Sequence, residues 1–145
     1  MKPRFILPEN FATQSGAADL STSKTALAAR VRSFRYAFEG IVFLFRNEPN
    51  ARIHLAASLA AMGAGLYLDL GWADWRWILL AMALVWIAEA LNTAVEQVCN
   101  LVCPGPSPQV KAAKDVAAAA VLVAAIAAAA IGAATFIPAA AASVG

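Results

Sequence analysis

The chain has 145 residues, of which 61% are hydrophobic and 14% charged, with a mean hydropathy of +0.67 and a net charge of +2. A soluble domain carries about 25% charged and 45–50% apolar residues. The interior of a soluble fold of this length is too small for so many apolar side chains, which favours a protein embedded in a bilayer. The small net charge argues against a nucleic-acid-binding protein, and the presence of only two cysteines argues against a disulfide-stapled secreted fold.

The N-terminal part of the chain changes character near residue 29. Residues 1–28 are polar and mixed, and we expect them to form a flexible cytoplasmic tail without chemistry. From about 30–46, apolar side chains recur at spacings of three and four: Val31, Phe34, Phe38, Ile41, Val42 and Phe45. With the arginines between them, they predict an amphipathic helix on the surface of an anionic leaflet, although a surface helix of a soluble bundle would show the same pattern.

Three apolar stretches follow and predict three transmembrane helices in an all-α membrane bundle. They cover about 51–70, 75–99 and 114–137, and each can cross about 30 Å of hydrocarbon at about 1.5 Å per residue. Together with the surface helix they form one membrane domain, residues 29–138. Pro138 is expected to end the third span and to leave residues 139–145 as a short tail.

The distribution of charge predicts the orientation of these spans. Of the 11 Lys and Arg residues, all but Arg76 lie in the tail, the amphipathic helix, the start of the first span or the 100–114 loop. The positive-inside rule then places the N-terminus and the 100–114 loop in the cytoplasm. The third span is mostly alanine, which allows helices to approach closely and favours a homo-oligomer.

The second span carries polar residues that a bilayer disfavours. Glu89, Asn92 and Glu96 fall on one stripe of the helix, and Glu89 lies roughly two turns inside the membrane. An ionisable group at that depth is by default a functional hypothesis. Two other interpretations stay open: a non-catalytic bundle that uses the stripe for assembly, and a small ion channel. The apolar run between Trp77 and Ala88 counts against the channel.

Further charged residues are expected at the same leaflet as this stripe. Glu48 precedes the first span, and Lys114 and Asp115 open the third, all on the cytoplasmic side. Several carboxylates beside one lysine suit Mg²⁺ held between protein oxygens and substrate phosphates, with the lysine as a point charge for phosphate. His54, the one histidine, lies near the same interface and is interpreted as a structural hydrogen-bonding residue.

Four ordered segments resemble the small prokaryotic diacylglycerol kinase and undecaprenol kinase family. Residues 88–96, AEALNTAVE, are similar to the pattern E-x-x-N-[ST]-A-[IV]-E of that family. Residues 33–40 resemble its amphipathic helix, residues 46–54 its N-E-x-N-x-R-I-H stretch, and residues 113–118 its A-K-D-x-[AG]-[AS] stretch. The order and spacing match over about residues 30–138.

The resemblance implies an integral membrane lipid kinase of the bacterial inner membrane. It implies a homotrimer, each chain with a surface helix and three spans, and transfer of the γ-phosphoryl group of MgATP to a lipid hydroxyl on the cytoplasmic side. The acceptor would be diacylglycerol, which gives phosphatidic acid, or undecaprenol, which gives undecaprenyl phosphate. The motifs leave this choice open.

The resemblance also implies roles for seven residues, in sites formed between subunits. The catalytic residues would be Glu89, as general base for the lipid hydroxyl, and Asn92. The metal ligands would be Glu48 and Glu96, and the nucleotide would be bound by Tyr36, Lys114 and Asp115. Glu89 would be desolvated inside the bilayer, and a desolvated carboxylate is a stronger base.

Two positions depart from the family pattern. Asn100 stands where an Asp is expected, so one acidic contribution near the nucleotide or the metal is absent. Glu39 stands where a Lys is common, which changes the expected contacts with phosphate or the leaflet. Neither change removes a residue that the resemblance assigns to the chemistry.

Overall fold

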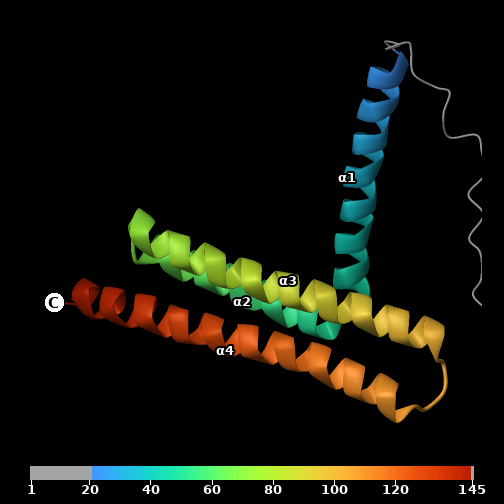
Figure 1. Ribbon diagram of the computed structural model, residues 1–145. Helices are drawn as coiled ribbons and strands as arrows, with labels where there is room; N and C mark the ends of the chain where they lie inside the picture. Colours follow the sequence, from blue (N-terminus) through green and yellow to red (C-terminus); the bar gives the residue numbers. More distant parts are fainter. Residues whose placement is uncertain (1–20, 145) are drawn as a thin grey trace, which may run out of the picture. The chain divides into compact units, whose positions relative to one another are not determined.

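The computed structural model describes residues 21–144, which form four helices (Figure 1). These are α1 (Ser21–Asn47), α2 (Pro49–Tyr67), α3 (Trp72–Val102) and α4 (Pro108–Val144). The predicted all-α class is therefore confirmed for this part of the chain. The chain divides into two compact units, Met1–Glu39 and Gly40–Gly145, and the second holds α2, α3, α4 and the end of α1.

Helix α1 begins earlier than predicted. The periodic apolar pattern starts at Val31, but the helix starts at Ser21, so only residues 1–20 of the expected tail lie outside the described residues. Ala, Leu and Lys in the intervening stretch are strong helix formers, which sustain a helix without an apolar face. Farther along, Val31, Phe34 and Phe38 are mostly exposed, as expected for a face that rests on a membrane surface.

The joint between α1 and α2 is held by hydrogen bonds to the last carbonyl groups of α1. Arg52 donates from Nε to the Phe45 carbonyl (3.1 Å) and from Nη2 to the Arg46 carbonyl (2.8 Å). These carbonyls have no partner within their own helix, so the guanidinium satisfies them. Pro49 fills the first turn of α2, where its missing N–H costs nothing, and Glu48 is the N-cap residue. The joint thereby places Glu48 at the start of the bundle.

Helix α2 ends in a Schellman turn. Asp69 has a positive φ of 50°, and the Leu70 and Asp69 amides donate to the Gly65 and Leu66 carbonyls at 3.0 and 3.3 Å. The chain then reverses into α3. Gly65 lies beneath Trp75, and a Cβ at this position would stand 2.9 Å from two atoms of the indole ring.

This close approach predicts different effects for two neighbouring glycines. Gly65→Ala and Gly63→Ala gain the same helix propensity, but a Cβ on Gly63 meets nothing within 4 Å. Gly65→Ala must displace Trp75, so it should be less stable than Gly63→Ala by about 1–3 kcal/mol. Thermal unfolding of the two variants in detergent, followed by circular dichroism, measures the difference. Equal melting temperatures would show that the indole moves aside at no cost.

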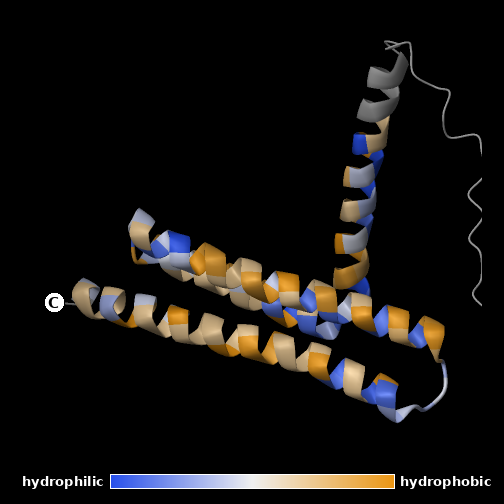
Figure 2. Ribbon diagram, viewed as in Figure 1, coloured by the Kyte–Doolittle hydropathy of each residue, from blue (hydrophilic) through white to orange (hydrophobic). Residues whose placement is uncertain are grey.

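Helices α3 and α4 form an antiparallel hairpin, and α2 packs against α3 (Figure 1). Within the described residues, α3 (Trp72–Val102) and α4 (Pro108–Ser143) are long and apolar enough to cross a membrane. Helix α2 has 19 residues and is not among them, because Asn50, Arg52 and His54 make its first turns polar. Figure 2 shows the apolar residues along the middle of these helices and hydrophilic residues around the α1–α2 joint and the α3–α4 loop.

The prediction that Pro138 ends the last helix is wrong. Helix α4 continues through Pro138 to Val144. The proline removes one backbone hydrogen bond and its ring presses on the preceding turn. The four alanines that follow it have the strongest helix propensity of any residue, so the helix resumes at once. Residues 139–144 are therefore part of the helix rather than a separate tail.

Candidate functional site

The carboxylate of Glu89 is buried without a hydrogen-bond partner. Its side chain is 1% exposed, and neither Oε1 nor Oε2 has a partner within the described chain. One turn farther along α3, the buried Thr93 hydroxyl also lacks a partner. Unpartnered buried polar groups are costly and uncommon. This face of α3 therefore presents polar atoms whose hydrogen-bonding capacity is unused.

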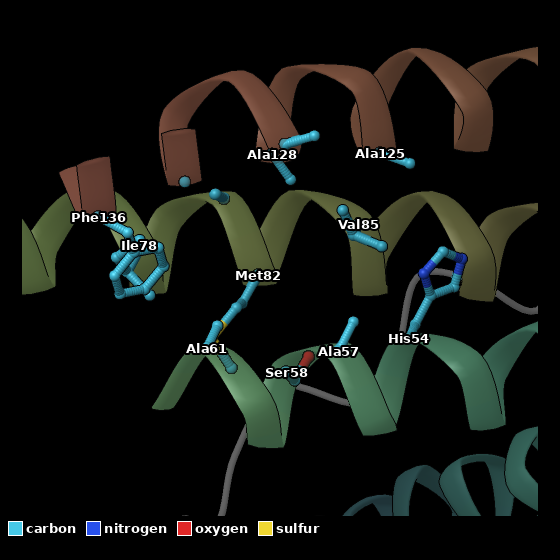
Figure 3. A pocket seen from close by; sticks show the side chains of 13 residues that line it. His54, Ala57, Ser58, Ala61, Ile78, Met82, Val85, Ala125, Ala128 and Phe136 are labelled. Atoms are coloured by element: carbon cyan, nitrogen blue, oxygen red, sulfur yellow. The ribbon is translucent and has the colours of Figure 1, made fainter. Parts of the chain in front are cut away.

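The basic side chain nearest to Glu89 is His54, which reaches it from α2. Nε2 of His54 lies 3.8 Å from Oε2 of Glu89, and the histidine side chain is 17% exposed. This distance is longer than a hydrogen bond. Figure 3 shows His54 at one end of a cavity of about 250 Å³, pointing from α2 towards α3. The remaining lining is almost wholly apolar and includes Ala57, Met82 and Val85.

Trp86 fixes the surroundings of this histidine. Its Nε1 donates a hydrogen bond to Oγ of Ser58 (3.2 Å), and its ring meets Phe45 edge-on at 5.2 Å between centroids. The His54 ring also lies edge-on to Trp86, at 6.5 Å and 74°. His54 and Ser58 are one turn apart on α2, so Trp86 contacts one face of that helix over two successive turns.

Glu48 adds a second carboxylate near Glu89. It is half-buried at the N-cap of α2, and its charge acts on the Glu89 carboxyl, as does that of His54. The three groups come from two helices whose relative position is set by the α1–α2 joint and by the packing of α2 on α3. The fold thus lets Glu48 act on Glu89, although Glu89 follows it by 41 positions in the sequence.

A second polar group lies nearer the α3–α4 loop and is built around Lys114. Its Nζ donates to Oδ1 of Asn100 (2.7 Å) and to Oε1 of Glu96 (3.3 Å). Lysine has three N–H donors, so one remains for a further acceptor. The amide at position 100 accepts the hydrogen bond that an aspartate would accept there. Although Asn100 departs from the family pattern, it therefore still holds Lys114 in place.

Asp115 and Tyr36 make other contacts. Asp115 pairs with Lys111 one turn earlier on α4, and both side chains are largely exposed. Tyr36 belongs to the N-terminal unit, where the Arg35 guanidinium stands 5.3 Å from its ring centroid. Arg35 also forms an ion pair with Glu39 at 3.4 Å. Glu39 thus pairs with a neighbouring arginine of the same helix, α1.

Asn92 lies on a different surface from Glu89. It is half-buried and lines a groove of about 1160 Å³ between α3 and α4, whose other walls are Leu84, Val95, Val116 and a row of alanines. An amide in such an apolar groove is the one polar side chain that can orient a ligand there.

The acidic residues suit a divalent cation by type, because Mg²⁺ prefers carboxylate oxygens. Among the described residues, no group of three or more His, Cys, Asp and Glu side chains lies close enough to hold a metal ion. Glu96 is engaged by Lys114, whereas the oxygens of Glu89 are free of hydrogen bonds. One chain thus supplies carboxylates of the right kind without closing a ligand set around an ion.

Comparisons with known proteins identify the family. The profile described as prokaryotic diacylglycerol kinase matches residues 35–136, more than half of the chain. This chain belongs to the prokaryotic diacylglycerol kinase family. The match covers α2, α3, most of α4 and the C-terminal part of α1 from Arg35, including both polar groups described above.

Two curated relatives are similar to this chain. The undecaprenol kinase of Bacillus subtilis is 38% identical over 90 residues, which are 62% of this chain and 73% of the relative. The diacylglycerol kinase of Synechocystis sp. is 40% identical over 91 residues, which are 62% of this chain and 52% of the relative. The match thus spans only about half of the second relative. The prediction of a lipid kinase that uses a phosphoryl donor such as ATP is confirmed at the level of the family.

The residues that sequence reasoning missed are those around His54. Ser58, Trp86 and Thr93 were not singled out, yet Trp86 holds the histidine edge-on and Thr93 shares the unpartnered face of Glu89. Helical spacing offers a signal for each, because Trp86 precedes Glu89 by three positions, Thr93 follows it by four, and Ser58 follows His54 by four. Which of these faces meet depends on the packing of α2 on α3.

Proposed function

We propose that this protein transfers the γ-phosphoryl group of MgATP to the hydroxyl of a membrane lipid alcohol, either diacylglycerol or undecaprenol. The observation that carries the proposal is the buried, unpartnered carboxylate of Glu89 beside His54, in a helix long and apolar enough to cross a membrane, within a chain of a lipid kinase family. A lipid hydroxyl entering this site from the bilayer would meet a carboxylate with no competing donor. Glu89 then acts as general base and accepts the hydroxyl proton during transfer.

The nucleotide is proposed to approach from the loop end of α3 and α4. Lys114, held by Glu96 and Asn100, has one donor left for a phosphate oxygen. Asp115 and Tyr36 contribute to nucleotide binding, and Asn92 orients the groups around the transferred phosphoryl. Phosphoryl transfer depends on alignment and charge neutralisation more than on covalent chemistry, so few groups are needed.

Glu48 and Glu96 are proposed as the residues that would hold Mg²⁺. When bound, the ion would neutralise charge on the phosphates. Because the described part of one chain does not close a three-ligand set, we propose that the complete site forms between copies in a homotrimer. Exposed large apolar side chains on α2, α3 and α4, such as Leu59, Leu91 and Val123, are available for contacts with lipid or with other copies.

The proposed membrane arrangement has three spans, with α2 as the first. At about 1.5 Å per residue its 19 residues reach about 28 Å, close to the thickness of the hydrocarbon core. Its polar first turns then lie in the cytoplasmic headgroup region, together with Glu48 and the α3–α4 loop. The site would face the cytoplasm of the bacterial inner membrane, with α1 on the leaflet surface and the N-terminus on the same side.

A direct transfer assay tests the proposal. Purified protein in mixed micelles is given radiolabelled ATP and Mg²⁺ with diacylglycerol, with undecaprenol, or with neither lipid. We expect label in the lipid fraction for at least one alcohol and very little ATP consumption without lipid. Label in neither lipid, with the protein folded and oligomeric, would contradict the kinase proposal and favour a bundle in which the polar residues serve assembly.

A further inference from the structure

We propose that His54 is a positioning residue that orients the carboxylate of Glu89 through its Nε2. The inference rests on the proposed role of Glu89 as general base and assigns that site a second residue. His54 Nε2 faces Glu89 Oε2 at 3.8 Å, and the two side chains are 17% and 1% exposed. Its imidazole is the basic group within ion-pair distance of this carboxylate in the described part of the chain.

The first reason is that Glu89 has no other partner. A general base must point its lone pair at the hydroxyl, and a free carboxylate can rotate about its last torsion, which is broad. Neither oxygen accepts a hydrogen bond from the described chain. A donor on one oxygen would fix the plane of the carboxylate and leave the other oxygen for the substrate. His54 is placed to be that donor.

The second reason is that His54 itself is held. Its ring lies edge-on to Trp86, and Trp86 is fixed by a hydrogen bond to Ser58 and by contact with Phe45. This framework borders one side of the ring, and Nε2 faces Glu89 at 3.8 Å. A movement of about 1 Å brings the pair to hydrogen-bond distance, and catalytic hydrogen bonds often tighten in this way when substrate binds.

The third reason is the position of His54 at the end of the apolar cavity between α2, α3 and α4 (Figure 3). Glu89 beside it is 1% exposed, so its carboxylate depends on protein donors rather than on solvent. The histidine therefore stands where a single donor has the largest effect on Glu89. A ring that served only to fill space would gain nothing from a nitrogen in this position.

Two substitutions separate positioning from packing. His54→Phe keeps a flat ring against Trp86 but removes the nitrogen, whereas His54→Gln keeps an N–H at similar reach but removes the ring. We expect His54→Phe to lower kcat by about 10–100-fold with an unchanged KM for MgATP, and His54→Gln to stay within about threefold of wild type. Wild-type activity in His54→Phe, or equal losses in both variants, would overturn the proposal.

A spectroscopic measurement tests the contact with the histidine in place. His54 is the only histidine of the chain, so with an affinity tag free of histidine its ring ¹⁵N signals are unique in the NMR spectrum of the full-length protein. We expect Glu89→Gln to shift these signals and Glu96→Gln, two turns farther along α3, to leave them in place. Unshifted signals in Glu89→Gln would overturn the proposal.

The two experiments also separate this inference from the proposed function. If Glu89→Gln shifts the histidine signals but phosphorylates lipid at the wild-type rate, the contact exists and the general-base role is wrong. If Glu89→Gln is inactive and His54→Phe is fully active, Glu89 is the base and His54 does not position it.

Discussion

Replacing Glu89 with Gln is expected to lower kcat for lipid phosphorylation by about 10²–10⁴-fold, the usual contribution of a general base. The amide has nearly the same shape, so the fold and the binding of nucleotide should change little. The loss corresponds to about 2.7–5.5 kcal/mol of transition-state stabilisation. Initial rates at saturating lipid and ATP, for wild type and variant, give the ratio directly.

The same substitution is expected to leave stability unchanged or to raise it. Burying a carboxylate whose oxygens have no partner is unfavourable, and the neutral amide removes the part of that penalty that comes from burying a charge. Catalytic residues often carry such a cost for stability. Thermal unfolding in detergent is therefore expected to show a melting temperature at or above that of wild type while activity falls.

Glu39→Gln supplies the matched control, since it makes the same chemical change at an exposed position that pairs only with Arg35 in the described structure. Its rate should remain near that of wild type. If Glu89→Gln instead dissociated the oligomer or lowered its melting temperature, the buried carboxylate of Glu89 would serve assembly. Full activity in Glu89→Gln would exclude the general-base role.

The helical architecture could be predicted because its signals are local. The apolar length of α3 and α4 and the turn residues between them are properties of consecutive residues, and they hold whatever the helices pack against. The errors are also local. Pro138 disfavours a helix, but the alanines that follow it favour one strongly enough for α4 to continue. Helix α1 begins at Ser21, where no apolar pattern marks its start.

The candidate site was predictable only in part. That Glu89 would be a buried carboxylate followed from its depth in an apolar helix, and the Lys111–Asp115 pair is readable from its i, i+4 spacing. The approach of His54 to Glu89 was not predictable, because it depends on which face of α2 meets α3. That choice is set by the Gly65–Trp75 contact, the Ser58–Trp86 hydrogen bond and the joint at Glu48, which act across separate helices.

The second large effect is expected for Lys114→Met, which should lower kcat/KM for MgATP by about 10–100-fold, the range for a lost hydrogen bond to a charged group. Lys114 is only partly exposed and is held by Glu96 and Asn100, so its third donor points in a defined direction. Methionine keeps most of the side-chain length and removes the charge. Steady-state kinetics with MgATP varied at saturating lipid measures the change.

Lys111→Met is the control that separates a specific contact from general attraction. Both lysines lie in the first turns of α4, and both substitutions remove one positive charge, but Lys111 is exposed and pairs with Asp115. If Lys114 binds phosphate directly, Lys111→Met changes kcat/KM less than threefold, and the defect of Lys114→Met persists at high salt. If the loop only attracts nucleotide by its net charge, both variants lose the same factor in kcat/KM for MgATP. High salt then abolishes the difference between each variant and wild type, because exposed charges are screened.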